Sequence, residues 1–328
     1  MTLQLINRGP NGVHIQPRRG RRHVLDLDDF SVEEVETVLE TATRMKDVLQ
    51  RPIKKVPTLR GKTLVTLFYE ASTRTRVGFE VAAKALGADT VSVAAASSSV
   101  TKGESLIDTI RTLQALGADF VVMRHHQAGA PYVVAEEVVS SVINAGDGWH
   151  AHPTQALLDL FTIRERLGHI DGLRVAIIGD ILHSRVARSN LWGLTLMGAS
   201  VVLCGPPTML PEPSFCGAGL PWQLQRTYHL DEALDGADVV MVLRMQLERQ
   251  TGGLFPILRE YVRTYGLTEE RLSKAKAGAL VMHPGPMNEG VEIDPKVARG
   301  VQSVIEAQVT NGVAVRMALL YLLSGLPS

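Results

Sequence analysis

The stretch that decides the fold is Phe68-Tyr69-Glu70-Ala71-Ser72-Thr73-Arg74-Thr75-Arg76. An apolar run at 64–67 precedes it, and apolar side chains at helical spacing follow it over 77–86. The pattern predicts a strand, a turn and a helix, with the Ser-Thr-Arg-Thr segment at the start of the helix. A helix N-terminus attracts anions, and hydroxyl and guanidinium groups donate well to phosphate oxygens. We therefore expect an anion-binding turn, in preference to a simple N-cap followed by solvated arginines.

The composition indicates a globular protein large enough for two domains. The chain has 328 residues, 45% hydrophobic and 21% charged, with a formal net charge of zero. This balance gives no reason to expect a nucleic-acid or membrane partner, and no apolar run approaches the roughly 20 residues that span a bilayer. Two cysteines, Cys204 and Cys216, fit a reducing compartment, so we expect a cytoplasmic protein. Cys204 ends an apolar run and is expected to be buried.

Strand and helix patterns alternate along the chain in two successive runs. The expected strands are apolar throughout, which is typical of parallel sheets covered on both faces. We predict an α/β fold of two doubly wound parallel-sheet domains joined by helices, with domains at 1–152 and 153–303 and a C-terminal helix, within 304–328, that packs back on the first. The expected strands are 64–67, 90–93, 120–123, 142–145, 175–178, 201–203, 239–243 and 280–282. The expected helices are 32–39, 77–86, 106–116, 132–139, 153–167, 186–196, 230–234 and 304–323.

Arginine recurs where the predicted strands end, whereas Asp and Glu hardly occur there. Ligands of doubly wound sheets bind at the carboxyl ends of the strands, so these loops indicate small substrates with several negative charges. The arginines are Arg74, Arg124, Arg185 and Arg244.

Several other chemistries are disfavoured. The sequence has no Gly-x-Ser-x-Gly elbow and no Ser/His/Asp order, which argues against an acyl-enzyme. The histidines at 125, 126, 150 and 152 lack accompanying Cys or acidic ligands, so we expect no metal site. A dinucleotide fingerprint and a P-loop are both missing, which counts against a nicotinamide-dependent dehydrogenase, the rival that the fold alone suggests.

Four motifs, in this order, resemble those of the aspartate/ornithine carbamoyltransferase family. They are Ser72-Thr73-Arg74-Thr75-Arg76, Met123-Arg124-His125, His152-Pro153-Thr154-Gln155 and His283-Pro284-Gly285-Pro286. The segment 244–249 is similar to the aspartate-binding loop of the aspartate branch, and the resemblance extends from about Leu25 to the C-terminal helix. It implies transfer of the carbamoyl group of carbamoyl phosphate to the amine of L-aspartate. The products would be N-carbamoyl-L-aspartate and phosphate, in the committed step of de novo pyrimidine biosynthesis.

The resemblance also implies which residues hold carbamoyl phosphate. Ser72, Thr73, Arg74 and Thr75 would hold its phosphate. The carbamoyl group would be surrounded by Arg124, His152 and Gln155, of which the first two polarise the carbonyl oxygen. Backbone groups at Gly285 and Pro286 would face the amine and the carbamoyl NH₂.

The same resemblance implies an aspartate subsite and a shared active site. Arg185 and Arg244 would hold the two aspartate carboxylates, and Gln246 would support that loop. Ser98 and Lys102 would come from a neighbouring subunit. Both would bind carbamoyl phosphate, and Lys102 would also bind aspartate. We therefore expect a homotrimer with shared active sites and no cofactor. The catalytic residues would be Arg74, Thr75, Lys102, Arg124 and His152.

Three points stay open at the level of the sequence. Ornithine carbamoyltransferases share the phosphate turn and the His-Pro-Thr-Gln motif, but Arg244 would repel the ammonium group of ornithine. A non-catalytic scaffold would keep the same fold, and a regulatory chain or a dihydroorotase would be further partners. Glu289 stands where one branch of the family often has Arg, and the sequence does not tell what this changes.

Overall fold

The computed structural model describes residues 21–94, 104–212, 224–245 and 257–325, which form two compact units. The first unit comprises Met1–Leu25, Glu40–Gly148 and Val313–Ser328, and the second comprises Asp26–Leu39 and Trp149–Gly312. Two helices, α1 (Val32–Gln50) and α11 (Ile305–Leu323), run from one unit into the other. Each unit contains one parallel sheet with helices, so the predicted α/β class with two parallel-sheet domains is confirmed. The predicted boundaries stay predictions.

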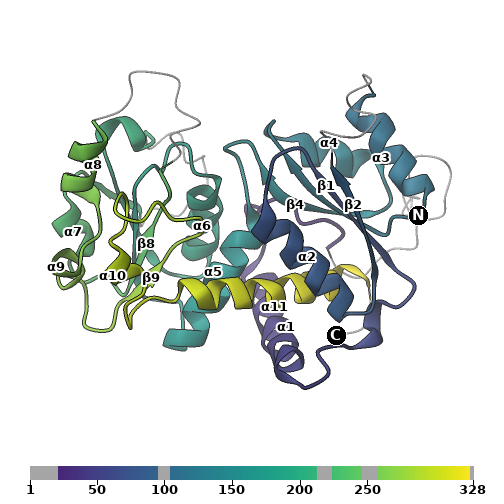
Figure 1. Ribbon diagram of the computed structural model, residues 1–328, viewed down its shortest axis with the longest axis horizontal. Helices are drawn as coiled ribbons and strands as arrows, with labels where there is room; N and C mark the ends of the chain where they lie inside the picture. Colours follow the sequence, from purple (N-terminus) through teal and green to yellow (C-terminus); the bar gives the residue numbers. More distant parts are fainter. Residues whose placement is uncertain (1–20, 95–103, 213–223, 246–256, 326–328) are drawn as a thin grey trace, which may run out of the picture. The chain divides into compact units, whose positions relative to one another are not determined.

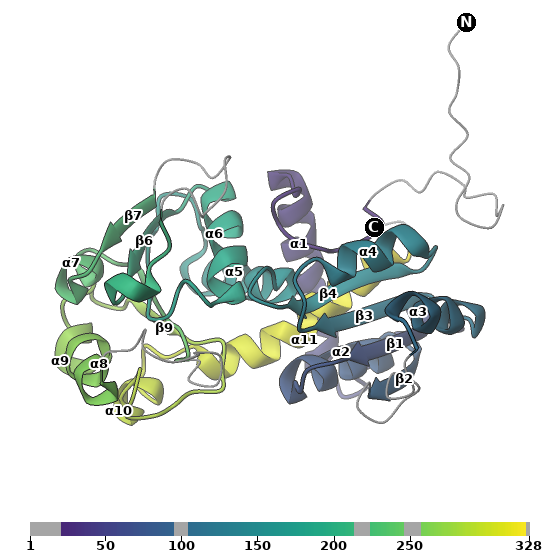
Figure 2. The same cartoon turned by 90° about the horizontal axis from the view of Figure 1, so that it is seen from above.

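The first unit has a four-stranded sheet in the order β2-β1-β3-β4. Apolar side chains of its strands pack on α3 and α4, and Figure 2 shows α2 on the opposite face. The chain leaves β1 for β2 on one side and continues to β3 on the other, so the strand order reverses between β1 and β3. The bounds are β1 (Thr63–Phe68), α2 (Thr73–Ala85), β2 (Asp89–Ala94), α3 (Leu106–Ala115), β3 (Phe120–His125), α4 (Ala130–Glu137) and β4 (Ser141–Asp147).

The end of α11 packs against α2 in this unit. The guanidinium of Arg316 lies 5.3 Å from the centre of the Phe79 ring. A Cβ added at Gly78 would come within 2.7 Å of Arg316 Nη1, so a side chain at position 78 would displace the buried arginine. The C-terminal helix is therefore fitted closely to the helix that begins at the predicted anion turn.

The second unit has a five-stranded sheet in the order β7-β6-β5-β8-β9, and its strand order reverses between β5 and β8. One face packs on α7 to α10 through a cluster that includes Cys204, which is fully buried as predicted. Figure 1 shows α5 and α6 beside this sheet. The bounds are α5 (Pro153–Leu167), β5 (Arg174–Ile178), α6 (Arg185–Leu196), β6 (Ser200–Cys204), β7 (Leu224–Thr227), α7 (Leu230–Leu234), β8 (Val239–Val242), α8 (Leu258–Tyr265), α9 (Glu269–Leu272), β9 (Leu280–Met282) and α10 (Pro295–Ala298). Among the described residues, the short 3-10 helix η1 (Pro57–Leu59) precedes β1 and the short 3-10 helix η4 (Pro207–Met209) follows β6.

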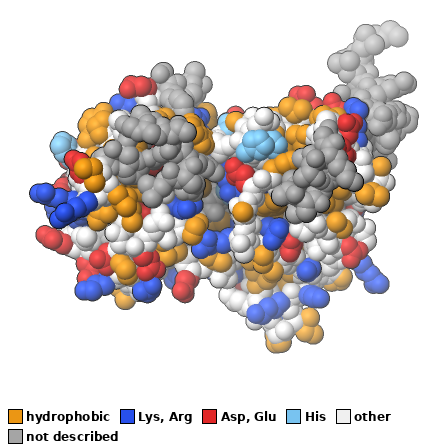
Figure 3. Space-filling model, turned by 45° about the horizontal axis from the view of Figure 1, so that its top comes forward, with side chains coloured by type: hydrophobic (Ala, Val, Ile, Leu, Met, Phe, Trp, Pro, Cys, Tyr) orange, Lys and Arg blue, Asp and Glu red, His pale blue; other side chains and the backbone are white. Residues whose placement is uncertain are grey.

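Figure 3 draws one face of the molecule, on which charged side chains of both signs lie among hydrophobic and other groups. On the face drawn in Figure 3, Lys and Arg side chains are interspersed with Asp and Glu side chains. Among the described residues, no helix is both long and apolar enough to cross a membrane.

Candidate active site

In the first unit, the predicted anion turn lies between β1 and α2. Ser72 is the N-cap residue with an extended backbone, but its hydroxyl makes no capping hydrogen bond, so simple capping does not account for it. Thr73 and Arg74 are exposed, whereas Thr75 is buried at 5% exposure. The turn therefore has the strand–turn–helix context that the sequence predicted, and it presents hydroxyl and guanidinium groups at a helix N-terminus.

Arg124 is brought beside this turn because β3 is the neighbour of β1. Phe68 and Arg124 are paired in register, and the Tyr69 N–H donates to the Arg124 carbonyl over 2.9 Å. Arg124 Nε donates to Glu70 Oε2 over 3.2 Å, with the two side chains only 14% and 22% exposed. Sequence reasoning gave Glu70 no role, although it stands inside the deciding stretch. A carboxylate four residues before Arg74, in a turn expected to bind an anion, could have been questioned on charge alone.

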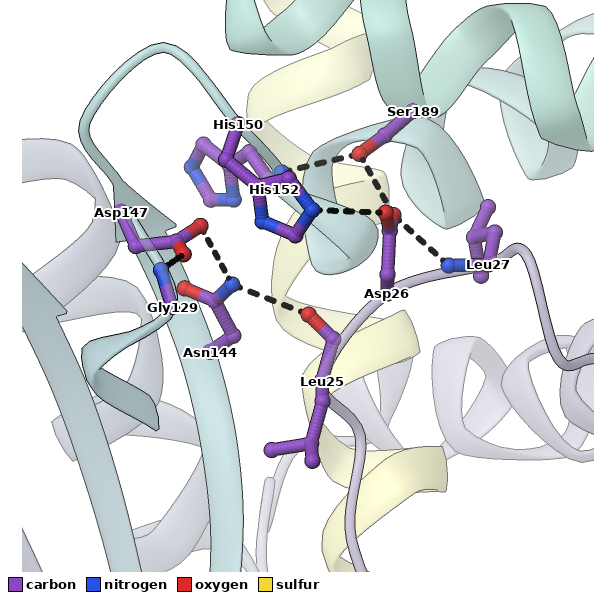
Figure 4. Close-up of polar contacts among 9 residues, drawn as sticks. All are labelled: Leu25, Asp26, Leu27, Gly129, Asn144, Asp147, His150, His152 and Ser189. Atoms are coloured by element: carbon purple, nitrogen blue, oxygen red, sulfur yellow. Dashed lines mark hydrogen bonds and ion pairs between the residues drawn. The ribbon is translucent and has the colours of Figure 1, made fainter. Parts of the chain in front are cut away.

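The carboxyl end of β4 carries a second polar network in the first unit (Figure 4). Asn144 Nδ2 donates to the Leu25 carbonyl over 2.9 Å and to Asp147 Oδ1 over 2.8 Å. Asp147 Oδ2 accepts from the Gly129 N–H over 2.7 Å. These bonds tie the incoming chain and the start of α4 to the end of the sheet.

In the second unit, His152 begins α5 and is 4% exposed. Its backbone N–H donates to Ser189 Oγ over 2.9 Å, and this hydroxyl donates to Asp26 Oδ1 over 3.2 Å (Figure 4). His150 Nε2 lies 3.7 Å from the other oxygen of Asp26. Burial raises the pKa of the Asp26 carboxyl to about 6, against the opposing effects of the Leu27 N–H, His150 and Ser189. The His-Pro-Thr-Gln motif is thus anchored through the backbone of its first residue.

Gln155, the last residue of that motif, is 8% exposed and bonded to a buried carboxylate. Gln155 Nε2 donates to Asp159 Oδ1 over 3.0 Å. Burial raises the pKa of Asp159 to about 6, and the amides of Asn190, Gln308 and Gln155 oppose the rise by donating to the carboxylate. Asp159 was not predicted as a site residue because, in the sequence, it cannot be told from an ordinary polar residue on the exposed face of a helix.

Arg185 and Arg244 follow the two strands between which the second sheet reverses its order. Arg185 is the first residue of α6, 4% exposed, just after the loop that leaves β5. Arg244 follows β8, which pairs directly with β5. In the loop after β5, the Asp180 carboxylate lies 2.7 Å from His183 Nδ1, which holds the loop before Arg185 in place. Two arginines therefore stand at neighbouring carboxyl ends, as the strand-end pattern predicted.

The His-Pro-Gly-Pro motif follows β9, the neighbour of β8. His283 is 1% exposed, and its Nδ1 accepts from the Gly285 N–H over 2.8 Å. The proton of the neutral ring is thus on Nε2, which lies 3.3 Å from Glu292 Oε1. Glu289 makes a bidentate contact with Arg299 over 2.9 and 2.8 Å, which gives this unassigned carboxylate a structural partner.

Three predicted site residues, Ser98, Lys102 and Gln246, lie outside the described residues. In the described ranges, His, Cys, Asp and Glu side chains form no group of three that could hold a metal ion. The remaining predicted residues fall into two sets, one at the carboxyl ends of β1 and β3 and one around α5, α6, β8 and β9. Both sets lie where ligands of doubly wound sheets bind.

Comparisons with known proteins agree with this arrangement. Residues 22–165 match the carbamoyl phosphate binding domain of the aspartate/ornithine carbamoyltransferases, and residues 171–323 match their Asp/Orn binding domain. The chain is therefore a transferase and belongs to the aspartate/ornithine carbamoyltransferase family.

Individual relatives are close in sequence and in structure. The chain is 66% identical over 308 residues to the aspartate carbamoyltransferase catalytic subunit of Roseiflexus sp. (strain RS-1), covering 94% of this chain and 96% of that one. The aspartate transcarbamoylase of Trypanosoma cruzi in complex with carbamoyl phosphate and aspartate is 30% identical, with a TM-score of 0.83 over 92% of this chain and 96% of that chain. The ornithine carbamoyltransferase of Pyrococcus furiosus has the same TM-score of 0.83 at 29% identity, over 93% and 98% of the two chains. Backbone similarity alone therefore does not separate the two acceptors.

Proposed function

We propose that this chain transfers the carbamoyl group of carbamoyl phosphate to the amino group of L-aspartate. The products are N-carbamoyl-L-aspartate and phosphate, and the reaction is the committed step of de novo pyrimidine biosynthesis. The 66% identity to a protein named aspartate carbamoyltransferase catalytic subunit supports this choice of acceptor. We assign the reaction to the cytoplasm because the chain has only two cysteines.

The observation that carries the choice of aspartate is the pair Arg185 and Arg244 at adjacent strand ends. L-Aspartate has two carboxylates, and a guanidinium fork matches a carboxylate better than any other side chain. Ornithine has one carboxylate and a cationic end, which a second arginine would repel. Two cations at the ends of β5 and β8 therefore favour a dicarboxylate.

The chemistry assigns a task to each set of residues. Ser72, Thr73, Arg74 and Thr75 neutralise the phosphate, which is the leaving group. Arg124 and His152 polarise the carbonyl oxygen, which gains negative charge as the amine forms its bond to the carbon. Gln155 and the backbone at Gly285 and Pro286 hold the carbamoyl NH₂ and the amine.

The size of these effects is sufficient without a covalent intermediate or a cofactor. Correct positioning of two reactants contributes roughly 7–11 kcal/mol towards a barrier. A preorganised donor at a developing oxyanion contributes about 3–4 kcal/mol more. Because both substrates are anions, neutralisation by arginine must come first, which explains why the predicted site is rich in this residue.

A homotrimer with shared active sites is part of the proposal. The first unit exposes apolar side chains next to its edge strand β2: Val77 and Val81 of α2 are each 43% exposed, and Val91 of β2 is 48% exposed. Exposed apolar side chains at a sheet edge favour an interface. The segment with Ser98 and Lys102 follows β2 directly in the chain, so a neighbour bound there would receive these two residues. A regulatory chain or a dihydroorotase would be a further partner, which co-purification would reveal.

The test is a product assay on the purified chain with carbamoyl phosphate and L-aspartate in the presence of a metal chelator. We expect carbamoyl-aspartate and inorganic phosphate in equal amounts. Release of phosphate without carbamoyl-aspartate, or no turnover at all by the assembled oligomer, would contradict the proposal.

A further inference from the structure

Asp159 is a fully buried carboxylate at which three helices meet in the second unit. Its Oδ1 accepts from Gln155 Nε2 of α5 over 3.0 Å and from Gln308 Nε2 of α11 over 2.7 Å. Its Oδ2 accepts from Asn190 Nδ2 of α6 over 2.8 Å. All four side chains are at most 8% exposed. Every bond runs from an amide NH₂ to the carboxylate, so Asp159 serves only as an acceptor.

Because Asp159 only accepts hydrogen bonds, it determines the orientation of the side-chain amides of Gln155 and Gln308. An ionised carboxylate cannot donate, so Gln155 and Gln308 must both turn their NH₂ groups towards Asp159. Each amide then keeps its oxygen and one N–H for other partners, with the oxygen pointing away from Asp159. Gln308 demonstrates the result, since its Oε1 accepts the backbone N–H of His283 over 3.0 Å.

We propose that Asp159 is a positioning residue for the carbamoyl group: it fixes the Gln155 amide with Oε1 as the acceptor for the substrate NH₂, and it holds the His283 loop through Gln308. This role rests on the proposed function, because it concerns the substrate of that reaction. One buried carboxylate thereby couples His-Pro-Thr-Gln to His-Pro-Gly-Pro, two motifs that are about 130 residues apart in the sequence. Burial is what makes the coupling strict, since no bulk water is present to satisfy a turned amide.

The chain contains its own control for this link. Further along the same two helices, Asn311 Nδ2 of α11 donates to Thr162 Oγ1 over 3.0 Å and to Glu165 Oε2 over 2.9 Å of α5. Asn311 and Thr162 are as buried as Gln308 and Asp159, and their bonds to each other and to Glu165 join the same two helices beyond Asp159 in the sequence of α5. Loss of the Asn311 link therefore weakens the packing of α5 on α11 without turning Gln155.

The experiment compares carbamoyl phosphate with acetyl phosphate, in which a methyl group replaces the NH₂. The measured quantity is the ratio of kcat/KM for the two donors at fixed, saturating L-aspartate. An acceptor for the NH₂ raises this ratio, whereas general damage to the fold lowers both values together. Inhibition by inorganic phosphate is measured in parallel, because the phosphate turn belongs to the other unit.

We expect Gln155→Leu and Asp159→Leu to lower the ratio by about tenfold, the effect of one lost hydrogen bond. In the double variant the ratio should fall by less than the product of the two single effects, since part of the effect of Asp159 passes through Gln155 and only the rest through Gln308. Gln308→Leu, which leaves the carboxylate in place, should lower the ratio as well, and it provides the test if Asp159→Leu does not fold. Asn311→Leu should leave the ratio within about twofold of the parent, and inhibition by phosphate should stay unchanged in all variants.

The activity of the parent protein distinguishes failure of the proposed function from failure of the positioning role. A parent that forms no carbamoyl-aspartate contradicts the proposed function. If the parent prefers carbamoyl phosphate and Asp159→Leu or Gln308→Leu keeps that preference, the positioning role is overturned while the proposed function stands. Equal ratios in Gln308→Leu and Asn311→Leu would overturn it too.

Discussion

Glu70 sets the charge balance at the carboxyl ends of β1 and β3. Its carboxylate receives the Nε–H of Arg124, so this arginine is oriented by a partner on the neighbouring strand end. The carboxylate also offsets one positive charge in a site proposed for an anion. An arginine held in this way contributes directed donors and less free positive charge, which suits a carbonyl oxygen better than a phosphate. This supports the proposal that Arg74 binds the phosphate, since no carboxylate contact of Arg74 is found in the described residues.

Arg74→Ala is expected to remove most of the affinity for carbamoyl phosphate. A charge-assisted contact contributes about 1.5–3 kcal/mol, which corresponds to a roughly 10- to 150-fold weaker Kd. Calorimetric titration measures it directly. Arg76→Ala is the matched control, since Arg76 lies two residues further on and 3.9 Å from Glu80 on the same helix. Equal losses in the two variants, or no loss in Arg74→Ala, would contradict the phosphate role.

Arg244→Leu is expected to raise the KM for L-aspartate by a similar factor, roughly 10- to 150-fold, because one carboxylate loses its guanidinium partner. The Kd for carbamoyl phosphate should change little. Arg174→Leu is the control: Arg174 begins β5, so it lies at the amino end of the same sheet, where no ligand is expected. Steady-state kinetics measures the KM of each variant. Equal effects of Arg174→Leu and Arg244→Leu on the KM for L-aspartate would contradict the proposal that Arg244 binds a carboxylate of the substrate.

At the scale of elements, the long apolar segments were predictable and the short polar ones were not. The strands β1, β3, β5 and β8 are apolar runs buried on both faces, and the periodicity of α5 and α11 is uninterrupted. By contrast, β7 is an edge strand with the sequence Leu-Gln-Arg-Thr and no fully buried residue, so it carries no hydrophobic signal. The helices α9 and α10 have four residues each, which is too short for a helical period to be seen.

The same distinction applies to the candidate site. The location of the motif residues at strand ends could be predicted from the sequence, because the carboxyl end of a parallel strand is a defined place for a ligand. The residues that orient them were not found. Asp159 is linked to Gln308 across 149 positions, and Asp26 to Ser189 across 163, so only the fold brings these partners together. The roles of all these site residues stay predictions, and for Ser98, Lys102 and Gln246 so does their location.

The segment that leads into α1 should give the protein a characteristic dependence of stability on pH. Burial raises the pKa of Asp26 from 3.8 to about 6, so the folded state binds a proton that the unfolded state releases between these values. The contribution of Asp26 to the free energy of unfolding is therefore full below pH 4 and falls as the pH rises to about 6. Two pKa units correspond to roughly 3 kcal/mol.

Asp26→Asn removes this proton uptake. We expect the stability of the variant relative to the parent to rise between about pH 4 and pH 6, by up to roughly 3 kcal/mol. Denaturant unfolding at fixed protein concentration measures the difference. Asp29→Asn, which changes an exposed carboxyl three residues away, should show a much smaller change over the same range. A flat difference for Asp26→Asn would contradict the buried, proton-binding carboxyl.

At the scale of the whole molecule, the proposed trimer makes activity a property of more than one chain. Arg74→Ala disables a residue of the chain's own phosphate turn, and Lys102→Ala disables one that the proposal assigns to a neighbour. Each variant alone should have strongly reduced activity when carbamoyl phosphate is kept near the KM of the parent. A mixture, after subunit exchange, should regain part of the parent activity, because some sites then receive an intact Arg74 from one chain and an intact Lys102 from another.

Subunit exchange is followed by native mass spectrometry with one variant labelled. The control mixes Arg74→Ala with Thr75→Ala, two changes in the same turn, which no exchange can separate into an intact site. Recovery in the first mixture only would support shared sites. Absence of recovery after demonstrated exchange would argue that each chain has a complete site of its own.

The central claim is that the pair Arg185 and Arg244 selects a dicarboxylate amine as acceptor. The most direct measurement is a competition in which the parent protein receives carbamoyl phosphate with equal concentrations of L-aspartate and L-ornithine, and both products are quantified by mass spectrometry. The account predicts carbamoyl-aspartate, with carbamoyl-ornithine at least a hundredfold lower, because ornithine leaves one arginine unmatched and brings a cation to it. Carbamoyl-ornithine as the main product would contradict the account at its centre.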